Sequence, residues 1–95
     1  MAENLFSIIL PLSENDNEKD VKNTLKSLLG QYFKDIEILI IKVKIPEEIK
    51  SILDSQEDER IKYFEAEDIS SAKNIGVENA SGKYLYFADT KGNLI

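Results

Sequence analysis

The chain has 95 residues, and its hydrophobic content of 42% is enough for the core of one small domain. A formal net charge of −6 and a pI near 4.6 argue against a nucleic-acid-binding protein and against electrostatic docking to anionic lipid, both of which need a basic face. The absence of cysteine excludes thiolate nucleophiles, disulfides and cysteine-bound zinc, and the absence of histidine removes the commonest general base. Any catalysis therefore depends on carboxylates, lysines, hydroxyls or a hard cation such as Mg²⁺ or Mn²⁺.

No segment of the sequence has the pattern of a targeting peptide or a membrane span. Glu3 lies where a signal peptide carries positive charge. The longest apolar stretch, 36–43, is interrupted by Glu37 and Lys42 and is far too short to cross a bilayer. We therefore expect a cytoplasmic domain without membrane contact through this segment, and the lack of cysteine is consistent with that location.

The first half of the chain alternates between strand and helix patterns. Residues 5–11 form a nearly continuous apolar run, which predicts a strand buried on both faces. Residues 15–18 offer helix-capping side chains, and Gly30 is a plausible helix stop. One apolar stripe at helical spacing follows residues 15–18, with Gly30 near its end; it is made by Val21, Leu25, Leu28, Leu29 and Tyr32. The β-branched run 36–43 predicts a second strand.

The same alternation continues to the end of the chain. Pro46 is expected at the first position of a second helix, and 61–64 predict a short third strand near a sheet edge. Asp68 or Ser70 is expected to cap a third helix that ends at 81–82. The packing face expected for that helix consists of Ala72, Ile75, Gly76, Asn79 and Ala80. A fourth strand over 84–88 runs into Asp89.

This order of elements predicts an α/β fold in one domain, residues 1–95, with three α/β/α layers and a mainly parallel sheet. Ligands of such sheets bind beyond the carboxyl ends of the strands, which directs attention to the loops 12–18, 42–46, 65–70 and 89–93. These loops carry neither a G-x-G-x-x-G nor a Walker A motif, and the first strand ends without the acidic pair of a phospho-receiver.

Five segments resemble, in order and with compatible spacing, the motifs of the inverting glycosyltransferases commonly called family 2. They are 6–11 (F-S-I-I-L-P, for the family's S-I-I-I-P-V-Y-N), 24–31 (T-L-K-S-L-L-G-Q, for T-L-x-S-L-L-x-Q), 35–41 (D-I-E-I-L-I-I, its second strand), 58–62 (D-E-R-I-K, for D-x-R-I-K) and 71–84 (S-A-K-N-I-G-V-E-N-A-S-G-K-Y, for S-A-R-N-x-G-x-x-x-A-x-G-x-Y). The resemblance implies the Rossmann-like, N-terminal, nucleotide-sugar-binding half of a GT-A domain. We expect its first strand between the second and fourth, with the third outermost.

The resemblance also implies site residues. Pro11, Lys73, Asn74 and Asp89 match positions at the donor-binding edge, and Asp89 matches the first acid of the family's D-x-D, which binds the Mg²⁺ or Mn²⁺ that holds the donor diphosphate. No residue of this chain is assigned a catalytic role. The second acid of D-x-D is replaced by Lys91, which repels a cation.

Two further departures affect the donor site. The family's acidic D-D-G-S-T-D after the second strand is replaced by K-V-K-I-P-E at 42–47, and a lysine cannot accept a hydrogen bond from a base or a ribose. Lys73 replaces an arginine, keeping the charge but losing the planar fork that grips phosphate. The sequence thus predicts eroded donor and metal motifs and a doubtful metal cofactor.

Alternative interpretations of these residues stay open. Asp89 is either a metal or ribose ligand or the first residue of a turn. Asn74 either contacts the donor or holds a loop. Four lysines either converge and bind diphosphate without metal or are solvated surface residues, the interpretation that we favour; they are Lys42, Lys44, Lys73 and Lys91.

Two functions follow. The first is a nucleotide-sugar-binding part of a sugar transferase acting on cell-surface glycans or a similar acceptor, inactive as an isolated chain, with the donor weakly bound or lost. The second is a non-catalytic pseudo-glycosyltransferase module used for protein-protein interaction or regulation. Because the chain ends soon after Asp89, we expect 84–88 to present a hydrophobic edge that pairs two copies as a homodimer, either as an antiparallel two-fold pair or by exchange of the tail 92–95.

Overall fold

The computed structural model describes residues 6–30 and 35–90, and strands alternate with helices through them. The strands are β1 (Phe6–Ser13), β2 (Ile36–Val43), β3 (Ile61–Glu65) and β4 (Tyr84–Phe87), and the helices are α1 (Glu18–Leu29), α2 (Glu47–Asp54) and α3 (Ile69–Asn79). The described strands form one sheet in the order β3-β2-β1-β4, and each neighbouring pair is parallel. The predicted α/β class and strand order are confirmed.

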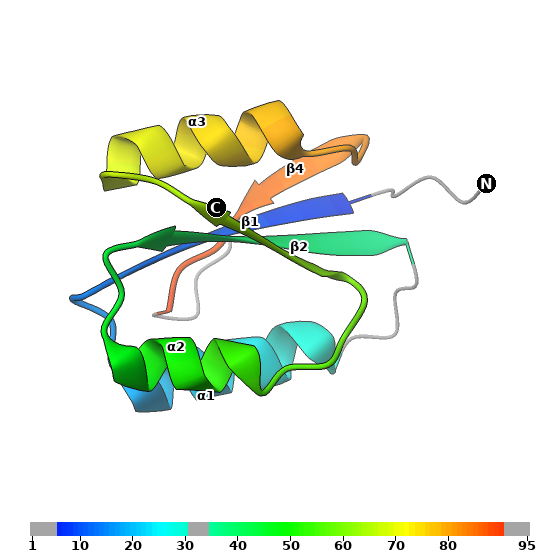
Figure 1. Cartoon of the computed structure of the whole chain (residues 1–95). Helices are drawn as coiled ribbons and strands as arrows, with labels where there is room; N and C mark the ends of the chain where they lie inside the picture. Colours follow the sequence, from blue (N-terminus) through cyan, green and yellow to red (C-terminus); the bar gives the residue numbers. More distant parts are fainter. Residues whose placement is uncertain (1–5, 31–34, 91–95) are drawn as a thin grey trace.

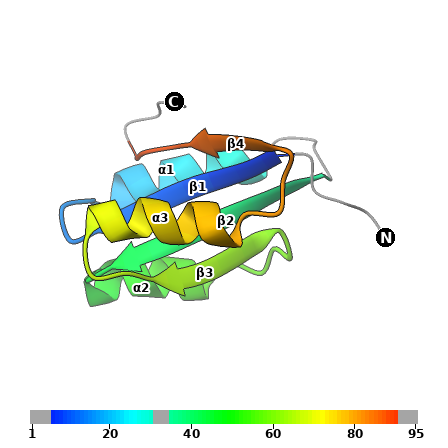
Figure 2. The same cartoon turned by 90° about the horizontal axis from the view of Figure 1, so that it is seen from above.

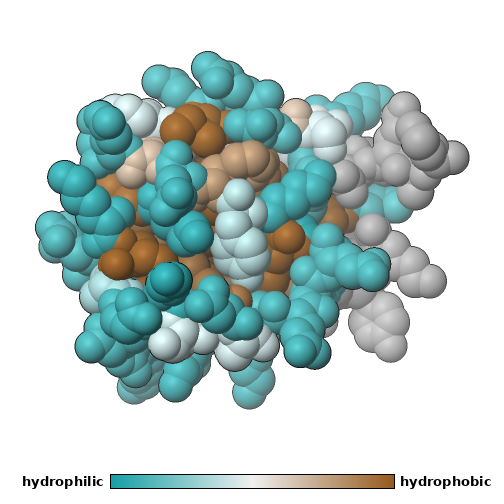
Figure 3. Space-filling model, viewed as in Figure 1, coloured by the Kyte–Doolittle hydropathy of each residue, from teal (hydrophilic) through white to brown (hydrophobic). Residues whose placement is uncertain are grey.

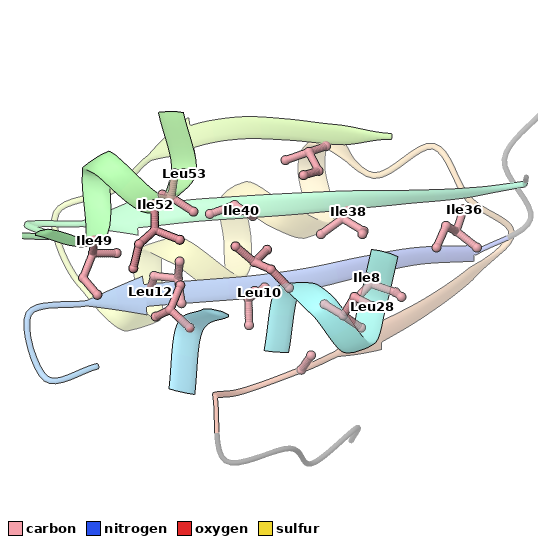
Figure 4. Packing of buried hydrophobic residues seen from close by; sticks show 14 residues of the cluster. Ile8, Leu10, Leu12, Leu28, Ile36, Ile38, Ile40, Ile49, Ile52 and Leu53 are labelled. Atoms are coloured by element: carbon pink, nitrogen blue, oxygen red, sulfur yellow. The ribbon is translucent and has the colours of Figure 1, made fainter. Parts of the chain in front are cut away.

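Helices α1 and α2 cover one face of the sheet and α3 covers the other, which gives the three predicted layers (Figures 1 and 2). Alternate side chains of the central strands point to the α1/α2 face and pack there against both helices (Figure 4). The residues between them point to α3, where Ile9, Leu39 and Ile41 pack around Ala72. Because β1 and β2 are buried on both faces, their sequences show a continuous apolar run. Hydrophilic side chains cover most of the surface seen in Figure 3.

The ends of the helices settle several details of the sequence prediction. Asn17 caps α1 by accepting a hydrogen bond from the backbone N–H of Asp20 (2.8 Å), and Asp68, not Ser70, caps α3 by accepting from Ser71 N–H (2.7 Å). Pro46 is the N-cap of α2 and not its first residue, because its extended backbone (ψ 166°) lies outside the helix. The prediction that Asn79 packs against the sheet is wrong.

The Asn79 side chain does not pack against the sheet because it is exposed and donates to the carbonyl of Ile75 one turn earlier (2.8 Å). Strand β1 also extends two residues past Pro11, since β2 offers it pairing partners as far as Val43. Gly76 is a close-packing position: a Cβ there would lie 2.5 Å from Cγ2 of Ile9, so a larger residue would push α3 away from β1.

A buried carboxylate joins the segments at the amino ends of the strands. Glu37 of β2 is 1% exposed and accepts hydrogen bonds from the Ser7 hydroxyl of β1 (2.6 Å), the Lys62 ammonium of β3 (2.6 Å), and both the backbone N–H and hydroxyl of Ser81. The Ser7 oxygen in turn accepts from the backbone N–H of Gly82 (2.7 Å). The turn from α3 to β4 is thereby tied to three strands.

The same contacts determine the charge of Glu37. Burial raises the pKa of this carboxyl, but the hydrogen bonds from Lys62, Ser7 and Ser81 outweigh it and lower the pKa from its ordinary 4.5 to about 2. The ionised form of Glu37 is therefore the one that stabilises the fold.

Gly82 fits beside Ser7 because it has no Cβ: a Cβ there would lie 2.5 Å from the Ser7 hydroxyl oxygen and 2.7 Å from the Ser7 backbone nitrogen.

Replacing the buried carboxylate tests its contribution. Since the pKa of Glu37 is depressed in the folded state, its stabilisation, on the order of 3 kcal/mol, is present above pH 4.5 and lost as the pH falls toward 2. Glu37→Gln should lower the free energy of unfolding at pH 7 by about 2–3 kcal/mol and flatten its dependence on pH below 4.5. Urea unfolding measures both quantities. Glu57→Gln, on the exposed loop, is the control, and equal losses in the two variants would contradict the assignment.

Candidate functional site

The strand order reverses at β1. The chain first moves outward through β2 and β3, and then α3 carries it back across the sheet to β4 on the other side of β1 (Figure 2). The carboxyl ends of β1 and β4 therefore mark the switch point at which open α/β sheets bind ligands.

Pro11 explains why the sheet opens at this point. The N–H of Ala88 donates to the carbonyl of Ile9 (2.9 Å), and the next bond of this parallel ladder would run from residue 11 to the carbonyl of Ala88. Proline has no N–H to donate, so that bond is absent. The regular pairing of β1 with β4 ends here, immediately before Asp89.

A cavity of about 290 Å³ lies at this opening. Its lining comes from the ends of β1 and β4, the loop before α1 and the first turns of α3, and it consists of Pro11, Ser13, Asp16, Ile69, Lys73, Phe87, Ala88 and Asp89. Three of the four predicted donor-binding residues thus surround one space: Pro11, Lys73 and Asp89. Asn74 is exposed on α3 and is not part of the lining, so its role stays a prediction.

Asp16 joins the two loops that flank this cavity. One of its carboxylate oxygens accepts from the hydroxyl of buried Thr90 (2.5 Å), and the other accepts from the backbone N–H of Ser13 (2.8 Å). Sequence reasoning treated Asp16 only as a capping candidate and missed this contact. No local signal marks it, because its partner lies 74 residues away.

The predicted lysines do not share one rim within the described residues. Lys42 and Lys44 line a different cavity, of about 410 Å³, together with Lys50, Glu65 and Glu67, whereas Lys73 lines the cavity beside β4. The ammonium of Lys42 lies 5.6 Å from the ring centroid of Tyr63. Two carboxylates thus offset the lysine charges of the second cavity, which favours the interpretation of solvated surface lysines. Lys91 lies outside the described residues.

The described residues do not fit a divalent metal. No three carboxylates within 6–30 and 35–90 are grouped as a metal would require. Asp16 and Asp89 both line the smaller cavity, but the Asp16 oxygens already accept from Thr90 and Ser13. Since Mg²⁺ and Mn²⁺ prefer several oxygen ligands, Asp89 is left as a single candidate ligand.

The sequence matches a known protein family. The profile of Glycosyl transferase family 2 matches residues 7–90. The chain belongs to this family.

Individual relatives show how much of a glycosyltransferase the chain represents. It is 37% identical to an uncharacterized glycosyltransferase of Rickettsia conorii over 90% of this chain and 14% of that protein. It is 31% identical to the GalNAc(5)-diNAcBac-PP-undecaprenol beta-1,3-glucosyltransferase of Campylobacter jejuni over 95% of this chain and 30% of that protein. The chain therefore spans less than a third of the length of these relatives.

A solved structure has the same fold. The crystal structure of S. aureus TarS superposes with a TM-score of 0.77 at 22% identity, over 90% of this chain and 16% of that one. The GT-A, Rossmann-like architecture of the family 2 domain is thus confirmed. No helix in the described part of the chain is long and apolar enough to cross a membrane.

The link between Asp16 and Thr90 can be tested by a double-mutant cycle. Asp16→Ala removes an acceptor from two donors, so it should lower the free energy of unfolding by about 1–2 kcal/mol. Combined with Thr90→Val, its effect should be less than additive by at least about 0.5 kcal/mol, because the two side chains share one hydrogen bond. Urea unfolding supplies the four free energies, with Glu14→Ala in the same loop as control. Strict additivity would contradict the link.

Lys44 allows a test of backbone strain at the edge of the sheet where the sequence departs from the family motif. Its φ of 51° lies in the left-handed region, and it aligns with the glycine of the family's D-D-G. Because a side chain is strained in this conformation, Lys44→Gly should raise the free energy of unfolding by about 1 kcal/mol. Lys50→Gly, at an exposed position of α2, should instead lower it by about 1 kcal/mol. Destabilisation by both substitutions would show that Lys44 is not strained.

Proposed function

We propose that this domain is the nucleotide-binding half of a glycosyltransferase, and that the cavity between the ends of β1 and β4 takes the nucleotide part of a nucleotide-sugar. One observation carries the proposal: Pro11, Lys73 and Asp89, which are distant in sequence, line a single cavity at the switch point of the sheet. Membership of Glycosyl transferase family 2 supports it.

The chemistry of the lining suits different parts of such a ligand. The Asp89 carboxylate can accept hydrogen bonds from ribose hydroxyls, and the Lys73 ammonium attracts a phosphate as a point charge. A volume of about 290 Å³ lies at the lower end of the range for small-molecule sites. The cavity is therefore proposed to hold part of the donor, with the sugar lying outside it.

Transfer itself needs groups that this lining does not offer. A general base has to lie within hydrogen-bond reach of the acceptor hydroxyl. Of the two carboxylates at the cavity, Asp16 accepts from Thr90 and Ser13, and Asp89 is proposed for the donor. We assign no catalytic residue, and transfer to a cell-surface glycan or similar acceptor is proposed only for a protein that contains the remaining half. The cytoplasmic location stays a prediction.

A second candidate function, a non-catalytic module for protein contacts, is favoured by one observation. Strand β4 is an edge of the described sheet, and three of its four side chains are large and exposed: Tyr84 (49%), Leu85 (40%) and Tyr86 (38%). An exposed apolar edge strand is a template for pairing with another strand. Pairing of two copies through β4 is the proposed form of this contact.

A nucleotide titration separates the two functions. Uridine diphosphate added to the ¹⁵N-labelled chain should shift the amide signals of Ser13, Asp16, Lys73 and Asp89, with a dissociation constant in the millimolar range. Mg²⁺ should not tighten binding, because the described residues do not form a metal site. Lys73→Ala should weaken binding at least about threefold, whereas Lys22→Ala, exposed on α1, should not. If no amide signal shifts at the highest nucleotide concentration, the nucleotide-binding function is refuted, and the module for protein contacts remains as the proposed function.

The same samples test catalysis. The isolated chain should not release or transfer sugar from UDP-glucose or UDP-N-acetylglucosamine above a control without protein, since no base is placed for the acceptor. Turnover that depends on metal, or micromolar affinity for uridine diphosphate with metal, would contradict the eroded site.

A further inference from the structure

Asp89, which lines the cavity, lies between two anchored neighbours in the chain. Ala88, which precedes it, is 6% exposed and donates its N–H to the carbonyl of Ile9 in β1 (2.9 Å). Thr90, which follows it, is 7% exposed and donates its hydroxyl to the Asp16 carboxylate (2.5 Å). Because consecutive Cα atoms are about 3.8 Å apart, the backbone of Asp89 cannot move far unless one of these two anchors is released.

Asp16 supplies the second anchor from a well-fixed position. Its other carboxylate oxygen accepts from the backbone N–H of Ser13 (2.8 Å), and its own N–H donates to the Ser13 carbonyl (3.1 Å). Ser13 is the last residue of β1 and pairs with Val43 of β2. The hydroxyl of Thr90 is therefore tied to the end of an inner strand of the sheet.

The second anchor lies where the ladder between β1 and β4 is interrupted. Ladder bonds hold this part of the chain as far as Ala88, and Pro11 has no N–H to donate to the next one. The side-chain hydrogen bond from Asp16 follows at Thr90. It joins two segments that both line the cavity, one through Ser13 and the other through Asp89.

We propose that Asp16 is a positioning residue of the nucleotide site: through Thr90 it sets the distance between the Ser13 and Asp89 sides of the cavity. It acts on the backbone of Asp89, whatever the Asp89 carboxylate itself contacts. A nucleotide that touches both sides binds more tightly when they are already held at the right spacing, because they need not be ordered during binding. This inference rests on the nucleotide site proposed above and names the side chain that preorganises it.

The anchor can be measured in the protein without nucleotide. The ¹⁵N order parameter of the Asp89 amide should lie near the value of about 0.85 that rigid backbone gives, and Asp16→Ala and Thr90→Val should each lower it toward about 0.6. Thr90→Ser keeps the hydroxyl and should keep the order parameter high. Glu37→Gln, at the opposite end of the sheet, is the control and should not change it. An unchanged order parameter in Asp16→Ala and Thr90→Val would overturn the anchor.

Nucleotide affinity tests the role of the anchor in binding. In amide-shift titrations, uridine diphosphate should bind Asp16→Ala and Thr90→Val each about fivefold more weakly, as expected when one hydrogen bond that orders a site is lost. The double variant should bind no more weakly than Asp16→Ala, because both changes release the same contact. Thr90→Ser should retain the affinity of the unchanged chain. Glu37→Gln should retain it too, although it destabilises the fold, which separates positioning from stability.

Three results would contradict the assignment in different ways. Weaker binding by Asp16→Ala with unchanged affinity in Thr90→Val would show that Asp16 contacts the nucleotide directly. Unchanged affinity in both variants, together with lower order parameters, would show that the anchor does not serve the site. If the unchanged chain does not bind uridine diphosphate, the nucleotide site itself is refuted and the positioning role with it, while the order parameters still report the anchor.

Discussion

The carboxylate of Glu37 is the interaction on which the arrangement of this domain depends. It is buried in the second strand, yet it accepts from β1, from β3 and from the turn that leads into β4. A buried charge is stable only when its lone pairs are satisfied, so these segments have to be in place together. The hydrogen bonds of Ser81 and Gly82 at this end tie the start of β4 to β1 and β2, in addition to the pairing of β4 with β1 itself.

The two ends of the sheet therefore have different roles. At the amino ends, the Glu37 network holds the strands together. At the carboxyl ends, Pro11 cannot donate a hydrogen bond and the regular pairing of β1 with β4 ends, beside the cavity that Lys73 and Asp89 line. Asp16 limits how far this end can open, because it links Ser13 to Thr90. The Glu37 hydrogen bonds thus lie at one end of the sheet and the candidate ligand cavity at the other, which is the end where open α/β sheets bind ligands.

Strand order, layers and most element boundaries could be predicted from the sequence because they follow from local patterns and from motif order. The Glu37 network could not, since a lone acid within an apolar run looks like an interruption of a strand until its partners are known. The role of Asp16 could not be predicted for a related reason. It lies among residues that cap helices, and its partner Thr90 is 74 residues away in the sequence. The sequence placed Pro11 and Asp89 at the carboxyl edge of the sheet, where both line the cavity, whereas Asn74 is exposed and does not line it.

The residues at the end of β2 show which constraints outlast a change in chemistry. Lys44 keeps a left-handed backbone that glycine would adopt without strain, although the acids that accompany that glycine in the family motif are lysine and valine here. Residues of β2 and α2 pack in the same core cluster, so the shape of the turn between them can persist when the side chains of the motif change. The cavity beside β4 is different, because Asp89 and a basic residue at 73 are retained there. Change at one edge with retention at the other is the pattern that the proposed weakening of nucleotide binding predicts.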